Sequence, residues 1–427
     1  MSVEVLPEKF QLQFLGAPGA QEPDIIKRAR KSAWDRFLQL GLPDTRSEAF
    51  QYMRLKLLFA EKFAPPNPVE AIEGETLKTL VLPECRSSYI VFVNGFLRLD
   101  LSNTEGLHKS ISIQNLGQAS RSFGTLLSNR WTKRIKEEKD CFAALNFACH
   151  TDGAFLYVPP KIRVEHPIQI IHAITANTHT WFMPRLELFQ GAESELTLLL
   201  STHTSKANNN FSSFVVDAHI EDNASLSWIE NGFEEERVSG WIFNAFRATL
   251  KRASRLKTIL LRRGGARARY DFKIELAGQG ADAHLSGLWL ANQEKEVHTH
   301  VVVDHQEPHT TSMQLFKGIL SDSAHSSFHG KILVRQKAQK TEAYQLNNNL
   351  LLSDTATANS KPGLEIFADD VKASHGATVG ELDKEQLFYL RTRGFTEAQA
   401  KNMLIDGFAQ EILGHIPIES LRELCQL

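Results

Sequence analysis

Histidine is the residue type in this chain whose placement most suggests chemistry. His375 lies in SHGAT (residues 374–378), a run of small residues that follows a short strand-like segment and a turn-forming KPG (residues 361–363). We expect it in a strand-to-turn segment, where the small neighbouring side chains let a second surface approach the histidine closely. A neutral imidazole binds iron, and its near-neutral pKa also suits proton transfer. His375 is therefore our main candidate for a functional residue.

A second group of histidines lies upstream. His298 and His300 are two residues apart in a predicted strand, so their side chains share one face. They are followed by His305, His309, His325 and His329. Such a group would suit Zn²⁺ or Fe²⁺, but no carboxylate or cysteine stands at tight ligand spacing. Hydrogen-bonded surface or turn histidines are the competing interpretation.

Other residues offer weaker chemistry. Asp369 and Asp370 resemble the paired carboxylates of β-solenoid glycosidases, but successive strand residues point to opposite faces unless a bulge turns them. Neither a phosphate-binding G-x-x-x-x-G-K-[ST] loop nor a dinucleotide fingerprint is present, so ATP hydrolysis linked to this chain requires a partner. No C-x-x-C pair occurs, so we expect buried or incidental thiols at the cysteines, which are Cys85, Cys141, Cys149 and Cys425.

The sequence predicts β structure for most of the chain. Residues 22–62 suggest two helices, about 25–40 and 47–63, and Asn94-Gly95 suggests a hairpin. After a helical stretch over residues 120–150, strand follows strand from 155 to 371. Turns that are made of small residues and contain an alanine recur about every 30 residues, which favours a solenoid over a sandwich. The alanines are Ala192, Ala224, Ala253 and Ala281, whereas Ala324 lies farther along the chain than this spacing predicts.

The C-terminal segment returns to helical periodicity. Asp383 caps one helix that ends at Gly394, and Thr396 with Gln399 forms a capping box that opens a second helix to about residue 413. A short helix follows at residues 418–424. We expect the pair to cover one end of the solenoid through an apolar face of the second helix, which comprises Ala400, Met403, Leu404, Phe408 and Ile412.

Three motifs in this region carry a family resemblance. They are NNNLLLS (residues 347–353), PGLEIFADDVKASHGATVG (362–380) and DKEQLFYLRTRG (383–394). Together they resemble the signature of the SufB/SufD family of iron–sulfur cluster assembly proteins. The SufB type has a cysteine after the Phe-Tyr pair, whereas this chain has Leu390, as does the SufD type. In the SufD type a functional histidine matches His375, but the cysteine often found two positions earlier is here Ala373.

The resemblance implies a mainly β fold, with a right-handed parallel β-helix core flanked by α-helical regions. We place an N-terminal, mainly helical region with a small hairpin at 1–150, the β-helix at 151–380 and a C-terminal helical region at 381–427. The implied function is that of a SufD-like, non-enzymatic subunit of the Suf scaffold, which supports iron acquisition and de novo cluster assembly. The implied partners are a SufB-like paralogue, a SufC-like ABC-type ATPase and, indirectly, a cysteine desulfurase system. A homodimer is expected when the chain is alone.

The resemblance also implies site residues. His375 would bind iron or a nascent cluster transiently at the interface with the paralogue, with no permanently bound cofactor. The ATPase would dock on the C-terminal helices, through Leu387, Phe388, Tyr389, Met403 and Phe408. Two alternatives stay open: a SufB-type scaffold that holds a cluster by itself, and a metal-dependent or carbohydrate-active β-solenoid enzyme.

Composition sets the remaining expectations. The 427 residues include 48 basic and 50 acidic side chains, so no overall charge draws the chain to nucleic acid or membranes. Residues 1–14 lack the pattern of a targeting leader, and no apolar run reaches the roughly 20 residues that span a bilayer. We expect a cytoplasmic protein.

Overall fold

The structure is a computed structural model. It describes residues 10–11, 13–14, 22–44, 46–68, 72–176, 179–204, 209–233, 239–265 and 267–426. Most of the N-terminal segment that was examined for a leader, residues 1–9 and 12, therefore lies outside the described residues.

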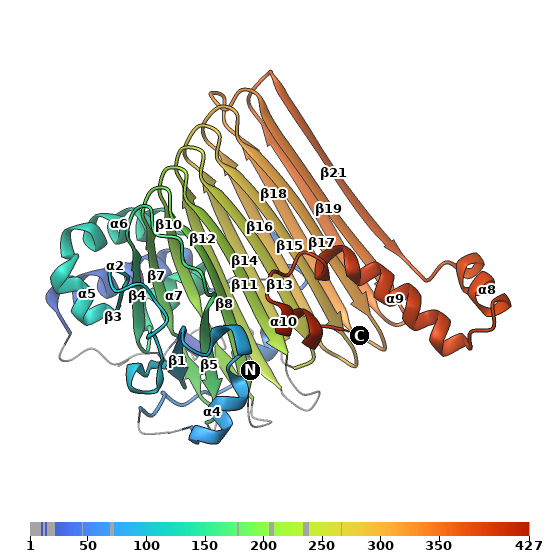
Figure 1. Ribbon diagram of the computed structural model, residues 1–427, viewed down its shortest axis with the longest axis horizontal. Coiled ribbons are helices and arrows are strands. Elements are labelled where there is room, and N and C mark those ends of the chain that lie inside the picture. Colours follow the sequence, from blue (N-terminus) through green and yellow to red (C-terminus); the bar gives the residue numbers. More distant parts are fainter. Residues whose placement is uncertain are drawn as a thin grey trace.

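Parallel strands that alternate between two facing sheets form the centre of the molecule (Figure 1). One sheet has ten strands, in the spatial order β2 (Phe96–Leu97), β1 (Tyr89–Val93), β5 (Ile168–Ile174), β8 (Glu195–Thr204), β11 (Ser225–Phe233), β13 (Arg255–Arg263), β15 (Asp282–Ala291), β17 (Thr311–Leu320), β19 (Thr341–Leu351) and β21 (Val371–Gly380). The other has eleven, in the order β20 (Thr357–Ile366), β18 (His325–Val334), β16 (Glu296–His305), β14 (Arg267–Leu276), β12 (Gly240–Leu250), β10 (Val215–Ile220), β7 (Arg185–Gln190), β4 (Gly153–Val158) and β3 (Ser112–Asn115), with β9 (Asn210–Ser212) beside β12 and β6 (Trp181–Phe182) beside β9. The result is a parallel β-solenoid of about seven turns, which confirms the predicted fold class. The boundaries placed at residues 150 and 380 stay a prediction.

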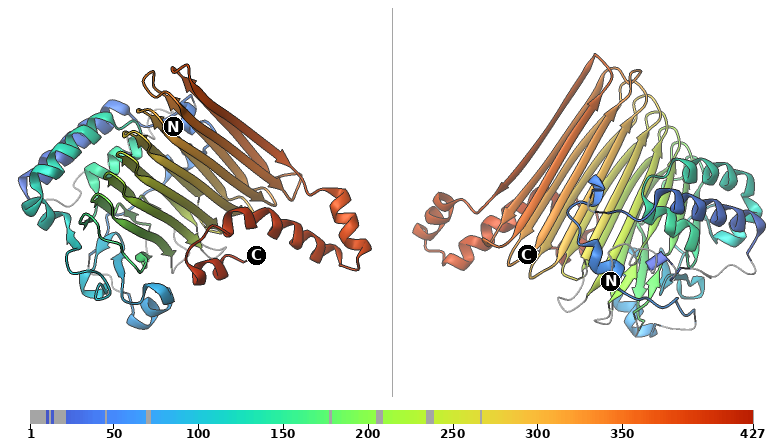
Figure 2. Two further views of the ribbon diagram at one scale, coloured as in Figure 1. Left: turned by 45° about the horizontal axis from the view of Figure 1, so that its top comes forward. Right: turned by 180° about the vertical axis from the view of Figure 1, so that it is seen from behind.

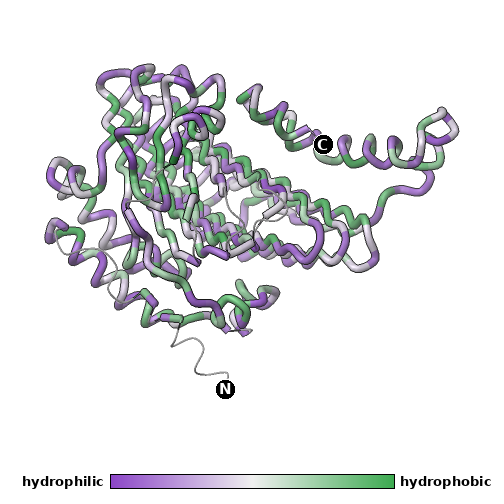
Figure 3. The backbone as a smooth tube through the Cα atoms, turned by 90° about the horizontal axis from the view of Figure 1, so that it is seen from below, coloured by the Kyte–Doolittle hydropathy of each residue, from purple (hydrophilic) through white to green (hydrophobic). Residues whose placement is uncertain are grey.

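The core lies between the two sheets. Because side chains alternate across a strand, every second residue of each strand points inward. Trp228 and Leu260 from the ten-stranded sheet meet Phe246 and Phe272 from the other, all at most 1% exposed. Hydrophobic and hydrophilic residues accordingly alternate along the stacked coils in Figure 3. The predicted hairpin at Asn94-Gly95 is confirmed: β1 and β2 are antiparallel, and both turn residues have positive φ.

The turns explain the repeat seen in the sequence. Successive turns from the eleven-stranded to the ten-stranded sheet, from β4–β5 to β18–β19, each contain one left-handed residue; these are Lys161, Glu193, Asn223, Ala253, Gly280, His309 and Lys340. The backbone N–H of each left-handed residue donates to a carbonyl in the next turn, as Asn223 does to Arg252. Ala192, Ala224, Ala253 and Ala281 lie in this row of turns. Ala324 lies in the opposite row of turns, between β17 and β18, which is why it does not fit the spacing of the other four alanines.

Helices of the N-terminal half cover the outer face of the eleven-stranded sheet (Figures 1 and 2). They are α2 (Asp24–Leu40), α3 (Leu55–Ala60), α5 (Leu116–Ser122), α6 (Gly124–Glu137) and α7 (Cys141–Cys149), with a short 3-10 turn at η1 (Glu48–Phe50). Three other short helices pack by strands of the ten-stranded sheet instead; they are α4 (Gly74–Leu80), η2 (Pro83–Cys85) and η3 (Leu99–Leu101). The continuous helix predicted for residues 47–63 is wrong, because η1 and α3 are separated by turns. The stretch 120–150 is likewise divided between helices.

Charged side chains are buried beneath these helices. Arg247 of β12 bonds with Glu138 after α6 (3.1 Å) and with Asp271 of β14 (2.6 Å), while Arg134 of α6 bonds with Asp217 of β10 (2.9 Å). Arg247 is 1% exposed and Asp217 3%. Each buried charge thus has an opposite partner, and the ion pairs fix the position of α6 against the strands.

The helices α9 (Glu397–Leu413) and α10 (Glu419–Leu424) lie on the outer face of the ten-stranded sheet. The helix α8 (Lys384–Thr392) buries none of its residues and projects away from the sheet (Figure 1). Ile412 and Leu413 of α9 and Leu421 of α10 pack on Ile229, Ile259 and Ile319. The expectation that these helices cover an end of the solenoid is therefore wrong, because their buried apolar residues pack on the outer face of the ten-stranded sheet. The caps predicted at Asp383 and Thr396 are confirmed.

One carboxyl group lies inside the solenoid. Glu230 of β11 points inward, is 5% exposed and accepts a hydrogen bond from Asn244 Nδ2 of β12 (2.6 Å). Burial raises the pKa of Glu230 from 4.5 to about 7. The folded chain therefore keeps a proton on Glu230 at a pH where the unfolded chain has lost it.

We predict a pH dependence of stability from this group. Its contribution is fully present below pH 4.5 and is lost as pH rises toward 7, by about 3 kcal/mol in the free energy of unfolding. Glu230→Gln should lack this component. Urea unfolding of wild type and variant at pH 5 and pH 8 measures it; equal pH dependence of the two proteins would contradict the prediction.

The C-terminal helices allow a second stability prediction. Ile412→Ala removes a side chain that is 0% exposed and should lower the free energy of unfolding by about 2–5 kcal/mol. Phe388→Ala alters a side chain that is 69% exposed and should change it by less than about 0.5 kcal/mol. Thermal or denaturant unfolding compares them. A large loss on Phe388→Ala would show that α8 is held by packing we have not identified.

Candidate functional site

His375 lies in the middle of β21, at the last coil of the solenoid. It pairs with Gln345 of β19, which in turn pairs with Gln314 of β17. These residues share the inner face of the sheet, because Phe316, two positions after Gln314, belongs to the core between the sheets. The placement in a strand-to-turn segment is wrong: SHGAT continues the ladder with β19 without interruption. His375 is exposed because β21 is the outermost strand of the described sheet.

Polar amides lie directly behind His375. Gln345 Nε2 donates to Gln314 Oε1 (2.8 Å), Asn347 Nδ2 to the Phe316 carbonyl (3.1 Å), and Asn349 Nδ2 to Asn347 Oδ1 (2.8 Å). All four amide side chains are at most 4% exposed. The run Asn347–Asn349 was expected in a buried strand, and this is confirmed. The last coils therefore have an amide-lined interior where earlier coils have an apolar one.

Sulfur ligands are absent from the neighbourhood of His375 among the described residues. Ala373 shares the inner face with His375 and packs, half-buried, in an apolar cluster with Ala343 and Ile332. All four cysteines are buried elsewhere, and burial raises the thiol pKa of Cys85, Cys149 and Cys425 to about 12. Thiolate is the form of cysteine that binds metal, so these side chains are poor ligands. The site can offer nitrogen, and its sulfur would have to come from outside.

Two strands leave unpaired edges at this end of the solenoid. Among the described strands, β21 has a neighbour only in β19, and β20 only in β18 (Figure 1). Lys361, Pro362 and Gly363 do not break the chain as predicted; all three pair with β18 inside β20. An edge strand tolerates proline, because the missing N–H need not remove a bond within the sheet.

The predicted docking residues lie on α8 and α9, close to the same end. Phe388 is 69% exposed, Tyr389 55% and Met403 45%, whereas Leu387 and Phe408 are half-buried. A cleft of about 470 Å³ separates the helices from the ends of β19 and β21, and Met403, Phe408, Thr378 and Val379 line it. Only residues 381–383 join β21 to α8. The strand that carries His375 thus leads straight into the exposed helices.

Lys317 is a residue that the sequence did not single out. It lies on the outer face of β17, 4% exposed, and its Nζ bonds with Glu411 (2.5 Å) and the Phe408 carbonyl (2.9 Å) of α9. The ammonium group also lies over the Phe408 ring, 4.3 Å from its centroid. A lysine within the mainly apolar run LFKGIL (residues 315–320) was the only sequence signal.

The upstream histidines form two ring pairs on the outer face of the eleven-stranded sheet. The rings of His298 and His325 are 5.5 Å apart, and those of His300 and His329 are 5.0 Å apart. Protein partners already engage three of them: His298 Nδ1 bonds with Ser327 Oγ (2.7 Å), His300 Nδ1 with Asp271 Oδ2 (2.6 Å), and His325 Nδ1 with Thr357 Oγ1 (2.7 Å). Burial lowers the pKa of His325 and His329 to about 4.

The other two histidines of this group stand apart. His305 is buried between Thr310 and Ser312, and His309 lies in a turn with positive φ. In the part of the chain that the structure describes, no three His, Cys, Asp or Glu side chains are arranged to hold a metal ion. The metal-enzyme alternative therefore has no support here.

Asp369 and Asp370 do not form a paired-carboxylate site. Both are exposed in the turn between β20 and β21, so the strand that was predicted to include them ends at Ile366. Backbone atoms of Asp370 bond with Lys340 and Gln339 in the preceding turn. These contacts hold the turn together rather than direct the carboxylates toward each other.

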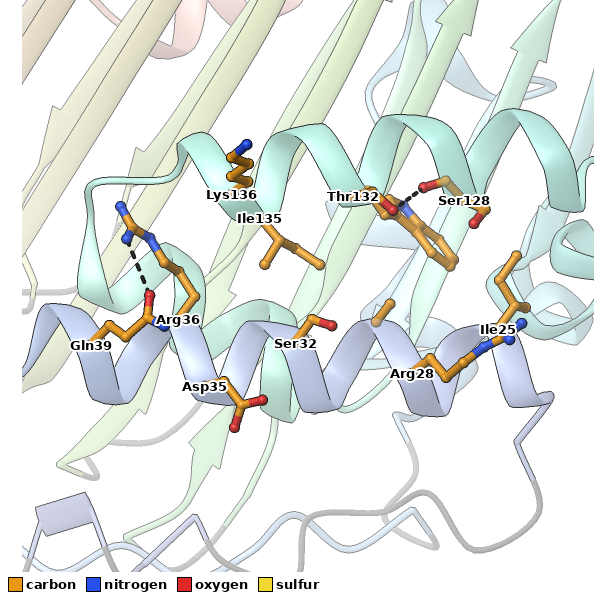
Figure 4. Close-up of a pocket in the computed structure, with 12 residues that line it drawn as sticks. Ile25, Arg28, Ser32, Asp35, Arg36, Gln39, Ser128, Thr132, Ile135 and Lys136 are labelled. Carbon is orange, nitrogen blue, oxygen red and sulfur yellow. Dashed lines mark hydrogen bonds between the residues drawn. The ribbon is translucent and has the colours of Figure 1, made fainter.

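Another groove lies elsewhere, between α2 and α6 (Figure 4). It has a volume of about 710 Å³, and its floor includes Ala29, Trp131 and Ile135. None of the predicted site residues lines it. Among the described helices, none has both the length and the apolar composition needed to cross a membrane.

Comparison with known proteins identifies the family. Residues 172–408 match the family described as "SUF system FeS cluster assembly, SufBD core domain", and residues 19–170 match "SufBD protein N-terminal region". An iron–sulfur cluster assembly SufBD family protein of Synechocystis is 31% identical over 94% of this chain and 90% of its own length. The iron–sulfur cluster assembly proteins SufD of Escherichia coli and Bacillus subtilis are 28% and 26% identical, over 91% and 94% of this chain and 88% and 93% of their own lengths. The chain therefore belongs to the SufBD family of the Suf system for iron–sulfur cluster assembly.

Proposed function

We propose that the chain is the SufD-like subunit of a Suf scaffold, which contributes one nitrogen ligand to a cluster site completed by another chain. The observation that carries this proposal is the position of His375: it faces inward at the uncovered end of the solenoid, with no thiolate beside it. Iron–sulfur clusters are held mainly by cysteine thiolates. A site with imidazole alone is therefore incomplete, and a cysteine-bearing SufB-like paralogue would complete it.

The paralogue would pair along the edges of β20 and β21. Each edge is ten residues long and presents backbone N–H and C=O groups that a second strand satisfies. Pairing would also cover His375 and enclose the cluster cargo between the two chains. The same edges would pair with a second copy when the paralogue is absent.

The ATPase would bind α8 and the first half of α9. Phe388, Tyr389 and Met403 are large, exposed and close together in the chain, which is typical of residues that anchor a partner. Because β21 runs directly into α8, a movement of the helices on ATP binding would reach the strand that carries His375. The paralogue interface would then open to iron and to sulfide from a cysteine desulfurase system, in support of iron acquisition and de novo assembly.

The first test concerns His375. His375→Ala should leave the complex with both partners intact, because the side chain is exposed and its strand is held by backbone pairing. Cluster formed on the anaerobically purified complex should fall about tenfold or more, measured as bound iron and sulfide. His108→Ala is the matched control, an exposed histidine that bonds only with nearby Ser110. Normal cluster content in His375→Ala would refute the proposed role.

The second test concerns the helices. The double variant Phe388→Ala, Met403→Ala should weaken ATPase binding about tenfold or more, while the paralogue still co-purifies. Leu38→Ala on α2 is the control, because Leu38 is also an exposed apolar helix residue, at 50% exposure. Quantitative pull-down from tagged chains compares them. Simultaneous loss of both partners would mean that the two surfaces are not separate.

A further inference from the structure

The row that ends at His375 contains an unsatisfied acceptor. Gln314, Gln345 and His375 are in register on β17, β19 and β21, and all three point into the solenoid. Gln345 Nε2 donates to Gln314 Oε1 at 2.8 Å, so the amide is engaged on the side away from His375. Its Oε1 is buried and has no hydrogen-bond partner among the described residues. A buried carbonyl oxygen without a partner is energetically costly, so a donor is expected there.

A second observation is that the opposite sheet leaves space for this amide at a glycine. Gln345 crosses the interior to the opposite sheet, where it lies against Gly330 of β18. A Cβ on Gly330 would stand 2.1 Å from Nε2 and 2.8 Å from Oε1. Since no side chain fits at residue 330 while the amide is there, the glycine leaves the space that Gln345 occupies.

We propose that Gln345 positions His375 by accepting a hydrogen bond, not formed in this structure, from one ring nitrogen of the imidazole. His375 follows Gln345 in the row, away from Gln314, and among the described strands it is the last residue of the row. With that N–H directed inward, the other ring nitrogen is deprotonated and presents its lone pair at the open end. Histidines that bind metal commonly have one ring N–H fixed in this way. Gln345 is thus a positioning residue, and this inference rests on the role proposed for His375.

The neutral amide also suits the task better than a carboxylate. A carboxylate at residue 345 would favour the imidazolium ion, in which both ring nitrogens are protonated and neither can bind iron. An amide oxygen accepts the N–H without adding charge to the interior.

The test is the tautomer of His375 in the full chain without iron. Nitrogen NMR of histidine-labelled protein distinguishes the two ring nitrogens, at a pH well above the ordinary histidine pKa of about 6.5. In the wild type we expect a single tautomer at His375, unlike His415, an exposed histidine after α9 that serves as an internal reference. Gln345→Leu should bring the His375 signals to the tautomer mixture of His415. Gly330→Ala should do the same by displacing the amide.

Matched variants separate positioning from folding. Asn349→Leu removes another buried amide of β19, which is opposite Val379, and should leave the His375 tautomer unchanged. Gln345→Glu keeps an acceptor oxygen and should keep the inward nitrogen protonated. The inference is overturned if wild-type His375 matches His415, or if Gln345→Leu leaves its tautomer unaltered in a protein that still folds.

The outcome is independent of cluster assembly, because the tautomer is read on the chain alone. In the complex with both partners, Gln345→Leu should lower cluster content about tenfold, as loss of a residue that orients a ligand does. If Gln345→Leu changes the tautomer but His375→Ala leaves cluster content unchanged, the proposed function fails while the positioning contact stands. If His375→Ala abolishes the cluster and Gln345→Leu alters neither readout, the proposed function stands and the positioning contact fails.

Discussion

Each coil of this solenoid satisfies the backbone of the coil before it, and the last coil has no such successor among the described residues. Parallel pairing runs without interruption from β5 to β21 in one sheet and from β4 to β20 in the other. At the start the stack is closed by antiparallel strands, β2 and β3. The opposite end keeps two unpaired edges of ten residues each. Soluble proteins usually protect such edges, so an uncovered pair is most simply explained as a surface that another chain covers.

Covering elements are placed to leave that end open. The N-terminal helices lie on one outer face, held by buried ion pairs around Arg247 and Arg134. The C-terminal helices α9 and α10 lie on the other face, held by apolar packing around Ile412 and by Lys317. The helix α8 projects past β21 (Figure 1) but buries none of its own residues, so it does not pack over the last coil. Two different kinds of interaction therefore leave the same end of the solenoid accessible.

The interior changes character toward that end. Trp228 and Phe246 stack in an apolar core, whereas Gln345, Asn347 and Asn349 line the inner face of β19. Buried amides demand partners, so they fix side-chain positions more narrowly than apolar packing does. If His375 serves as the proposed ligand, such fixed surroundings would help to orient its ring. The amides thus connect the physical chemistry of the core with the exposed histidine.

The sequence alone predicted a long β region, the helix caps and the main candidate residue, and its family resemblance predicted the β-helix. Strand periodicity, the caps at Asp383 and Thr396 and the motif around His375 are local patterns, and local patterns are readable in one chain. It misjudged KPG and SHGAT as turns, because glycine and proline signal turns unless an edge strand accommodates them. The turn repeat was only partly visible, because left-handed positions are occupied by residues as different as Glu193 and Lys340.

Only the tertiary structure decided which residues meet. It placed α9 on the side of a sheet rather than over an end, joined Lys317 to Glu411, and set Gln345 between Gly330 and His375. These contacts link residues about 15 to 95 positions apart. Their formation depends on the register of stacked coils, and register is set by the whole stack of paired strands rather than by any one segment.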